Sequence, residues 1–249
     1  MELQISFFIF RRNPSIQGSR NFNCNYLLNG LLEVLYIMRY SKSRFMFHLQ
    51  LLVLVSDYKG EMRNIMQYYY KEENLYNLIN STIHAVEMKN ELKQDESGIN
   101  MTYNFITNCV GFDATRLVEA WKEIEAAIPL DQYVKALTMH ELGHAMDREA
   151  LQQSLDRTLE IMEIKNSHSE IELYTNEQLL AIIIEEHEMN IIFEETAWNN
   201  AKQLNQKAVL VDEVTFELIK NHSLATYREL YEEDLLIYEK VKERHLQTV

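Results

Sequence analysis

The sequence predicts an α+β protein that is predominantly helical. Its 249 residues include only six glycines and two prolines, too few for a turn-rich β-sandwich or for long irregular loops. After residue 60, apolar residues recur at steps of three and four, the periodicity of helices that bury one face. β-Branched and aromatic residues gather in MTYNFITNCVGFD (101–113), which predicts a small sheet or hairpin. An apolar content of 47% is typical of a chain that buries a substantial core.

Residues 1–60 differ from the rest of the chain in charge. They contain seven Lys/Arg and three Asp/Glu and therefore carry +4 of a net charge of −14, which leaves −18 on the remainder. We expect an N-terminal extension or accessory segment over 1–60 and one domain over 61–249. An alternative is that the protein begins at Met46 or Met62, which would make the first residues an upstream extension.

Turn-forming residues separate the elements expected within 61–249. QDESGIN (94–100) and NSHSE (166–170) are typical breaks. Pro129 and Asp131 are favoured at a helix N-terminus, so a helix should begin beside them. The predicted elements, in order, are a helix over 61–93, the strand or short hairpin of 101–113, an amphipathic helix over 114–127, a helix from about 129 towards Lys165, and two long helices over about 176–205 and 212–244.

Charge and composition exclude several classes of function. A net charge of −14 argues against nucleic-acid binding, because phosphates require a positive surface, and against docking on anionic membranes. The apolar runs are shorter than the roughly 18 residues that span a bilayer, and ISFFIF precedes RR, the reverse of the order in a secretory signal. Cys24 and Cys109 are too few for a disulfide framework. We predict a cytoplasmic protein, and the sequence does not indicate its oligomeric state.

The segment HELGH (140–144) has the residues of a zinc site with its catalytic base. His140 and His144 are four residues apart, so on a helix they share one face and can direct a ring nitrogen at one ion. Glu141 lies about 100° around the helix, beside such an ion, where a carboxylate can take a proton from an activated water. Gly143 is unfavourable in a helix interior and indicates that something packs close to the backbone there.

A five-residue motif of this kind also arises by chance. A third ligand elsewhere in the chain is therefore needed to support the interpretation as a zinc site. Catalytic zinc usually has three protein ligands and an open position for water. Further along the chain, Glu194 falls in an apolar stripe beside Trp198, and a carboxylate that faces the core is unfavourable unless it is paired or binds a metal. Glu194 is therefore the first candidate, and Glu195 is the second. Asp147 is too far along the helix to be a ligand; it suits a hydrogen bond to a ligand histidine or a solvated surface position.

HELGH followed some fifty residues later by EETAW on a second helix resembles the gluzincin arrangement of zinc metallopeptidases. It is similar in particular to the small ImmA/IrrE-type peptidases of bacteria and their mobile elements. In these, a glutamate three residues before a small residue completes the site, which corresponds to Glu194 and Ala197. The resemblance covers about 100–205. It implies a zincin-like fold with a small sheet or hairpin packed on the HExxH helix, zinc ligands His140, His144 and Glu194, and Glu141 as general base.

The function that this resemblance implies is zinc-dependent hydrolysis of peptide bonds in a peptide or protein substrate. The edge of a sheet at 101–113 would bind an extended peptide as an added strand, although an ordinary strand that covers the core fits the same residues. Two other classes stay open: a site that binds zinc without catalysis, and a helical interaction protein without a metal. The last of these predicts that Glu194 is exposed or paired with a base.

Overall fold

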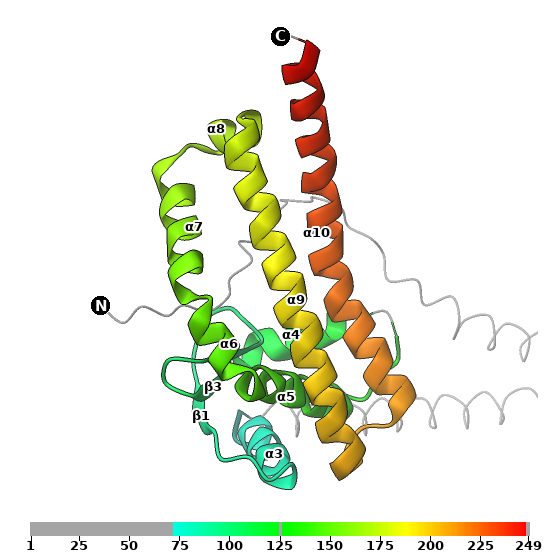
Figure 1. The fold of residues 1–249 in the computed structure, drawn as a ribbon. Helices are drawn as coiled ribbons and strands as arrows, with labels where there is room; N and C mark the ends of the chain where they lie inside the picture. Colours follow the sequence, from blue (N-terminus) through cyan, green and yellow to red (C-terminus); the bar gives the residue numbers. More distant parts are fainter. Residues whose placement is uncertain (1–71, 125, 248–249) are drawn as a thin grey trace, which may run out of the picture. The chain divides into compact units, whose positions relative to one another are not determined.

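The structure, a computed structural model, describes residues 72–124 and 126–247, which fall in the same unit of the chain. It is mostly helical with a three-stranded mixed sheet, so the predicted fold class is confirmed. The predicted segment 1–60 lies outside the described residues. The elements in chain order are α3 (Glu72–Ala85), β1 (Glu91–Gln94), β2 (Met101–Asn104), β3 (Cys109–Phe112), α4 (Ala114–Glu123), α5 (Leu130–Met146), α6 (Arg148–Gln153), α7 (Leu155–Ser167), α8 (Glu170–Thr175), α9 (Glu177–Ala208) and α10 (Glu213–Gln247) (Figure 1).

The sheet has the strand order β1–β3–β2, with β1 parallel and β2 antiparallel to the central strand. The predicted hairpin corresponds to β2 and β3. In their register Tyr103 lies opposite Val110, and all four residues of β3 are buried. Asn108 closes the turn with φ 57, and its Oδ1 accepts hydrogen bonds from Tyr103 Oη (2.7 Å) and Asn90 Nδ2 (2.9 Å). These bonds hold the hairpin in one register.

The first helix was predicted to run to residue 93, but it ends at Ala85. The last residues of the predicted helix, 91–93, belong to strand β1 instead. After α3 the chain reverses through two hydrogen bonds, from Glu87 N to His84 O (3.0 Å) and from Met88 N to Ile83 O (3.1 Å). This pair is the Schellman arrangement that ends helices. Glu87 has φ 62, in the left-handed region that usually selects glycine. Because a glutamate stands there, the usual stop signal is missing, and the prediction of a helix up to 93 was wrong.

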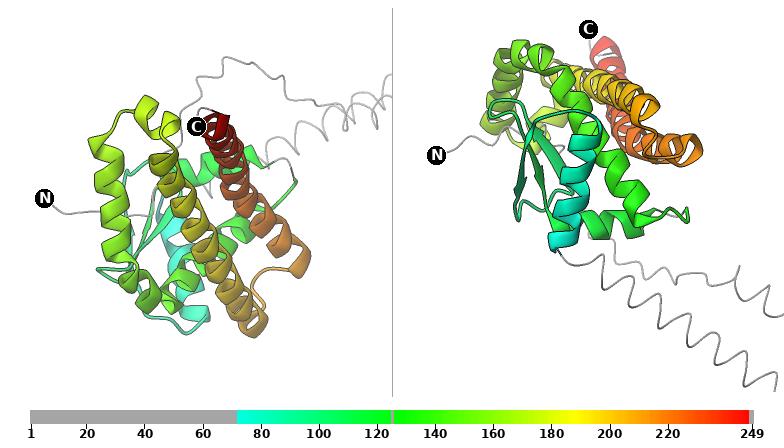
Figure 2. Two further views of the ribbon diagram at one scale, coloured as in Figure 1. Left: turned by 45° about the horizontal axis from the view of Figure 1, so that its top comes forward. Right: turned by 90° about the horizontal axis from the view of Figure 1, so that it is seen from below.

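Helix α5 lies at the centre of the described unit. It packs between α3 and the sheet on one side and α9 with α10 on the other (Figures 1 and 2). Every residue from 136 to 143 is buried, including the polar residues Thr138, His140 and Glu141. The Thr138 hydroxyl donates to the backbone oxygen of Val134 (2.7 Å). Residues 140–143 of the HELGH segment therefore lie in the core, where their polar groups are removed from bulk water, and His144 is partly buried at its edge.

The helix predicted from about 129 towards 165 is three helices in the structure, α5, α6 and α7. The breaks are at Asp147 (φ −104, ψ 22) and Ser154 (φ −79, ψ −9). At the first break, Arg148 donates from Nε to the backbone oxygen of Phe105 (2.6 Å) and from Nη2 to that of Ile106 (3.0 Å). This contact with the β2–β3 turn fixes α6 at a new angle. Since neither break contains glycine or proline, local sequence does not reveal them.

Helices α9 and α10 run side by side (Figure 1), and their bounds agree with the predicted ones to within three residues. Polar contacts attach α9 to its neighbours on both sides. Arg157 of α7 donates from Nε to Glu185 (2.8 Å). Near α8, Asp234 accepts a hydrogen bond from Tyr174 Oη, and His187 Nε2 lies 2.9 Å from the same carboxylate oxygen. The part of α9 that precedes Glu194 is thereby attached to α7 on one side and to α10 on the other.

None of the helices α3 to α10 has the combination of length and apolar character that a helix needs to cross a bilayer. The two longest, α9 and α10, carry charged residues along their length.

The turn between α9 and α10 contains a strained residue, and relieving that strain should stabilise the protein. Val209 has φ 51 and ψ 47, unfavourable for a β-branched side chain, and it is 78% exposed. Asn205 holds the turn through hydrogen bonds with the backbone of Leu210 and Val211. Because asparagine tolerates this conformation, Val209→Asn should raise the free energy of unfolding by about 1 kcal/mol in urea denaturation. The control is Val214→Asn, at an exposed helical position, which should change the free energy of unfolding little. A loss of stability in Val209→Asn would contradict the interpretation that Val209 is strained.

Candidate metal centre

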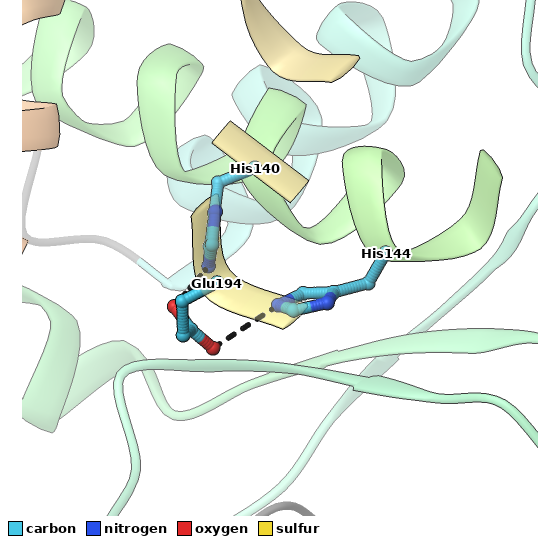
Figure 3. Close-up of side chains that lie close together, drawn as sticks. All are labelled: His140, His144 and Glu194. Carbon is cyan, nitrogen blue, oxygen red and sulfur yellow. Dashed lines mark ion pairs between the residues drawn. The ribbon is translucent and has the colours of Figure 1, made fainter. Parts of the chain in front are cut away.

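His140 and His144 of α5 and Glu194 of α9 converge on one point. Figure 3 shows both imidazoles directed toward the Glu194 carboxylate. Nε2 of His140 lies 3.2 Å from Oε2, and Nε2 of His144 lies 3.3 Å from Oε1. One ligand atom from each residue lies within 4.8 Å of the other two. Two ligands of a tetrahedral zinc ion are about 3.3 Å apart if each bond is about 2.05 Å. The two nitrogen–oxygen distances are of this size, although each ends on a different oxygen of Glu194, so the three side chains are close enough together to hold one ion.

The site exists because α9 crosses α5 with the two backbones in contact. A Cβ on Gly143 would lie 2.1 Å from the backbone oxygen of Ala197, so only glycine permits this approach. Asn200 Nδ2 donates to the backbone oxygen of Gly143 (3.0 Å) and joins the helices at the same point. Glu194 lies one turn before Ala197 and is thus brought opposite the histidine face of α5. The close packing that Gly143 indicates in the sequence is confirmed.

Burial and charge shift the pKa values at this site in opposite directions. Desolvation alone would raise the pKa of Glu194, but His140 and His144 outweigh it and hold that pKa well below its usual value. Burial lowers the pKa of His144, yet the carboxylates of Glu194, Glu141 and Asp147 raise it on balance. The pKa of Glu141 is raised, chiefly by burial. A carboxylate buried as deeply as Glu194 (6% exposed) requires adjacent positive charge, which protonated histidines or a metal ion can supply.

Two buried atoms at the centre lack hydrogen-bond partners within the described part of the chain, Nδ1 of His140 and Oε2 of Glu194. The 3.2 Å contact between His140 and Glu194 therefore brings nitrogen and oxygen together without forming a hydrogen bond. Buried polar atoms are normally paired, so Oε2 is available to an ion. Two imidazoles and one carboxylate are a donor set that catalytic zinc sites use. The residues present fit zinc.

The other residues that the sequence suggested for this site are Glu195, Asp147 and Glu141. They lie either away from the point where His140, His144 and Glu194 converge or beside it. Glu195 points to α10, where it accepts a hydrogen bond from Arg228 (2.7 Å), and its side chain is 44% exposed. Asp147 ends α5 half-buried and acts on His144 through its charge; its backbone N–H donates to the backbone oxygen of His144 (3.1 Å), and the described contacts contain no hydrogen bond between the two side chains. Glu141 is 7% exposed and lies next to the cluster. The metal-free interpretation predicted that Glu194 is exposed or paired with a base. Glu194 is not exposed, and it pairs with His140 and His144, so its position alone does not separate that interpretation from a metal site.

Two residues at the centre, Trp198 and Asn200, have contacts that the sequence did not predict. Trp198, recognised only as part of the apolar stripe, stacks on His140 with ring centroids 4.4 Å apart and planes inclined by 24°. Asn200 binds the backbone of the opposite helix, and no local pattern identifies it. Both contacts join different elements, so they become visible only once α5 and α9 are packed together.

No protein-family model matches this chain, and comparison with curated proteins or with solved structures gives no match either. The interpretation of the site therefore rests on its own geometry. The cluster of His140, His144 and Glu194 on two helices is consistent with an HExxH zincin motif.

Removing Glu194 should abolish tight metal binding at this centre, with zinc as the metal tested. We expect Glu194→Ala to weaken the affinity by more than about 100-fold, because losing a direct ligand has a greater effect than losing a residue that only supports one. Glu195→Ala is the matched control: it removes the neighbouring carboxylate, which binds Arg228, and should leave the affinity nearly unchanged. Competition with a chromophoric chelator measures both. An equal loss in the two variants, or a loss only in Glu195→Ala, would move the third ligand away from Glu194.

Proposed function

We propose that this protein is a zinc-dependent metallopeptidase in which His140, His144 and Glu194 hold the ion and Glu141 is the general base. One observation carries the proposal most: buried His140, partly buried His144 and the buried carboxylate of Glu194 meet at one point, with a second buried carboxylate on the residue after the first histidine. This arrangement supports water-based hydrolysis, since a base must lie beside the ion without occupying a ligand position.

The protein's own residues have distinct roles in this reaction. Zinc, when bound at this centre, polarises the scissile carbonyl and acidifies the attacking water. Glu141 takes the proton from that water and passes it to the leaving amine. The two histidines and Glu194 orient the reacting groups from two rigid helices, which favours a fixed geometry over one built on loops. Burial of α5 keeps bulk water out and strengthens these electrostatic interactions.

Strand β2 supports a peptide as the substrate. It is an edge of the described sheet and packs on α5. The hydrogen bond from Asp113 N to Asn100 O (3.2 Å) joins directly opposed residues; since such pairs alternate along an antiparallel ladder, the backbone groups of Met101 and Tyr103 point away from β3. The Met101 N–H is taken by Asn100 Oδ1 (2.8 Å). An extended peptide would therefore pair with β2 at Tyr103, on a strand that packs against the helix of the centre.

The experiment that tests this function is hydrolysis of a mixture of unstructured peptides in ¹⁸O-labelled water. Zinc-loaded protein should produce new C-termini that each contain one ¹⁸O atom, because the attacking water supplies one carboxylate oxygen. A chelator should stop the reaction and added zinc should restore it. Protein that contains zinc and cleaves none of the peptides would contradict the peptidase and leave a non-catalytic site. The cytoplasmic location, and the exclusion of nucleic-acid and membrane partners, stay predictions.

A further inference from the structure

His140 is held differently from most histidines that bind metals. Such a histidine usually donates its second ring N–H to a carboxylate or a backbone oxygen, which fixes the ring's orientation. Within the described residues, Nδ1 of His140 has no hydrogen-bond partner. The ring is instead stacked on Trp198, with centroids 4.4 Å apart and planes inclined by 24°, and His144 meets it edge-on at 4.7 Å. The indole lies against the face of the imidazole rather than in the ring plane beside Nδ1, so the contact that can orient this ring is a stacking contact.

Trp198 is suited to this task by its own surroundings. It is completely buried and lies one turn after Glu194 on the same face of α9. Two residues of α10 hold its ring: Phe216 packs edge-on at 5.6 Å, and Trp198 Nε1 donates a long hydrogen bond to Ser223 Oγ (3.4 Å). The path from α10 to His140 thus runs through one rigid side chain.

We propose that Trp198 is the positioning residue of the metal centre: it fixes the His140 imidazole in its metal-binding orientation and makes α10 a structural part of the site. The proposal rests on the zinc site described above and concerns how the chain holds it. Trp198 contacts neither the reacting atoms nor the ion, so it acts through His140. Helix α9 then supplies both a ligand, Glu194, and the platform for a ligand from α5.

The test compares zinc affinity in full-length wild type, Trp198→Leu and Trp198→Phe, measured by chelator competition. Trp198→Leu removes the aromatic face and should weaken binding by about 10–100-fold, the usual effect of losing a residue that orients a ligand. Trp198→Phe keeps a face for stacking and should stay within about threefold of wild type. With Co²⁺ in place of zinc, the visible absorption bands should shift in the leucine variant and not in the phenylalanine variant. Trp121→Phe changes the other tryptophan, which donates to Ile128 O (2.7 Å), and should change neither readout.

The possible outcomes separate this inference from the proposed function. Wild-type affinity in a folded Trp198→Leu, or equal losses in the leucine and phenylalanine variants, would overturn the positioning role while leaving the zinc site intact. If the leucine variant does not fold, Ser223→Ala provides the test instead, because it removes the hydrogen bond from Trp198 Nε1 to α10. A loss of zinc affinity of a few-fold would support the positioning role of Trp198, and an unchanged affinity would overturn it. A wild-type protein that binds no zinc would overturn the proposed function and this inference together.

Discussion

Glu141→Gln should lower kcat/KM for peptide hydrolysis by about 10²–10⁴-fold and leave zinc bound. Glutamine has nearly the shape of glutamate but cannot accept the proton from the attacking water. Since Glu141 is not among the three converging residues, its replacement removes the base and keeps the ligands. Steady-state kinetics on a peptide identified by ¹⁸O incorporation, together with zinc content, measures the two effects separately.

A matched control for this variant is Glu149→Gln, which neutralises an exposed carboxylate on the neighbouring helix α6. It should retain both activity and zinc. Full activity in Glu141→Gln would contradict the role of Glu141 as base. Loss of zinc in the same variant would instead place Glu141 among the ligands.

Gly143→Ala should destabilise the fold and the metal centre together. A Cβ there would lie 2.1 Å from the oxygen and 2.8 Å from the carbon of the Ala197 carbonyl, and backbone atoms of a packed helix cannot yield as a flexible side chain can. Alanine favours the helix by about 1 kcal/mol over glycine, but overpacking should outweigh this gain. We expect the free energy of unfolding to fall by roughly 2 kcal/mol or more, and zinc affinity to fall as Glu194 is displaced. Urea denaturation and chelator competition measure these changes.

Gly111→Ala is the comparison that isolates the helix crossing. Its added Cβ would meet only side-chain atoms, Thr102 Oγ1 at 2.7 Å and Asp95 Oδ2 at 3.0 Å. Both side chains can shift, so the loss of stability should be smaller and zinc affinity should stay near that of wild type. A Gly143→Ala protein as stable as wild type would contradict this account. It would show that the backbones of α5 and α9 are farther apart at Gly143 and Ala197 than the structure places them.

The parts of the fold and site that depend on periodicity could be predicted from the sequence. The four-residue spacing of His140 and His144 defines one helix face wherever that helix packs. Glu194 stands out because a carboxylate in an apolar stripe needs a partner, and the structure brings it, rather than Glu195, to the two histidines. The long helices α9 and α10 and the β2–β3 hairpin follow from the same kind of pattern.

The features that depend on contacts between elements could not be predicted. The end of α3 is set by a left-handed Glu87, where only a glycine would have been recognised as a stop. The break after α5 is stabilised by Arg148 on the β2–β3 turn. The stack of Trp198 on His140 requires α5 and α9 to be packed already. At Arg148 and Trp198 the deciding partner lies far away in sequence, so no local rule contains it; at Glu87 the stop is local, but it lacks the glycine that usually marks one.

The central claim is that His140, His144 and Glu194 bind one zinc ion, and zinc X-ray absorption spectroscopy of the purified wild-type protein tests it most directly. The account predicts about one zinc per chain with a first shell of nitrogen and oxygen at about 2.0–2.2 Å, including scattering from two imidazoles. Glu194→Ala should lose this signal. Absence of zinc after reconstitution, or a shell with sulfur at about 2.3 Å, would contradict the claim.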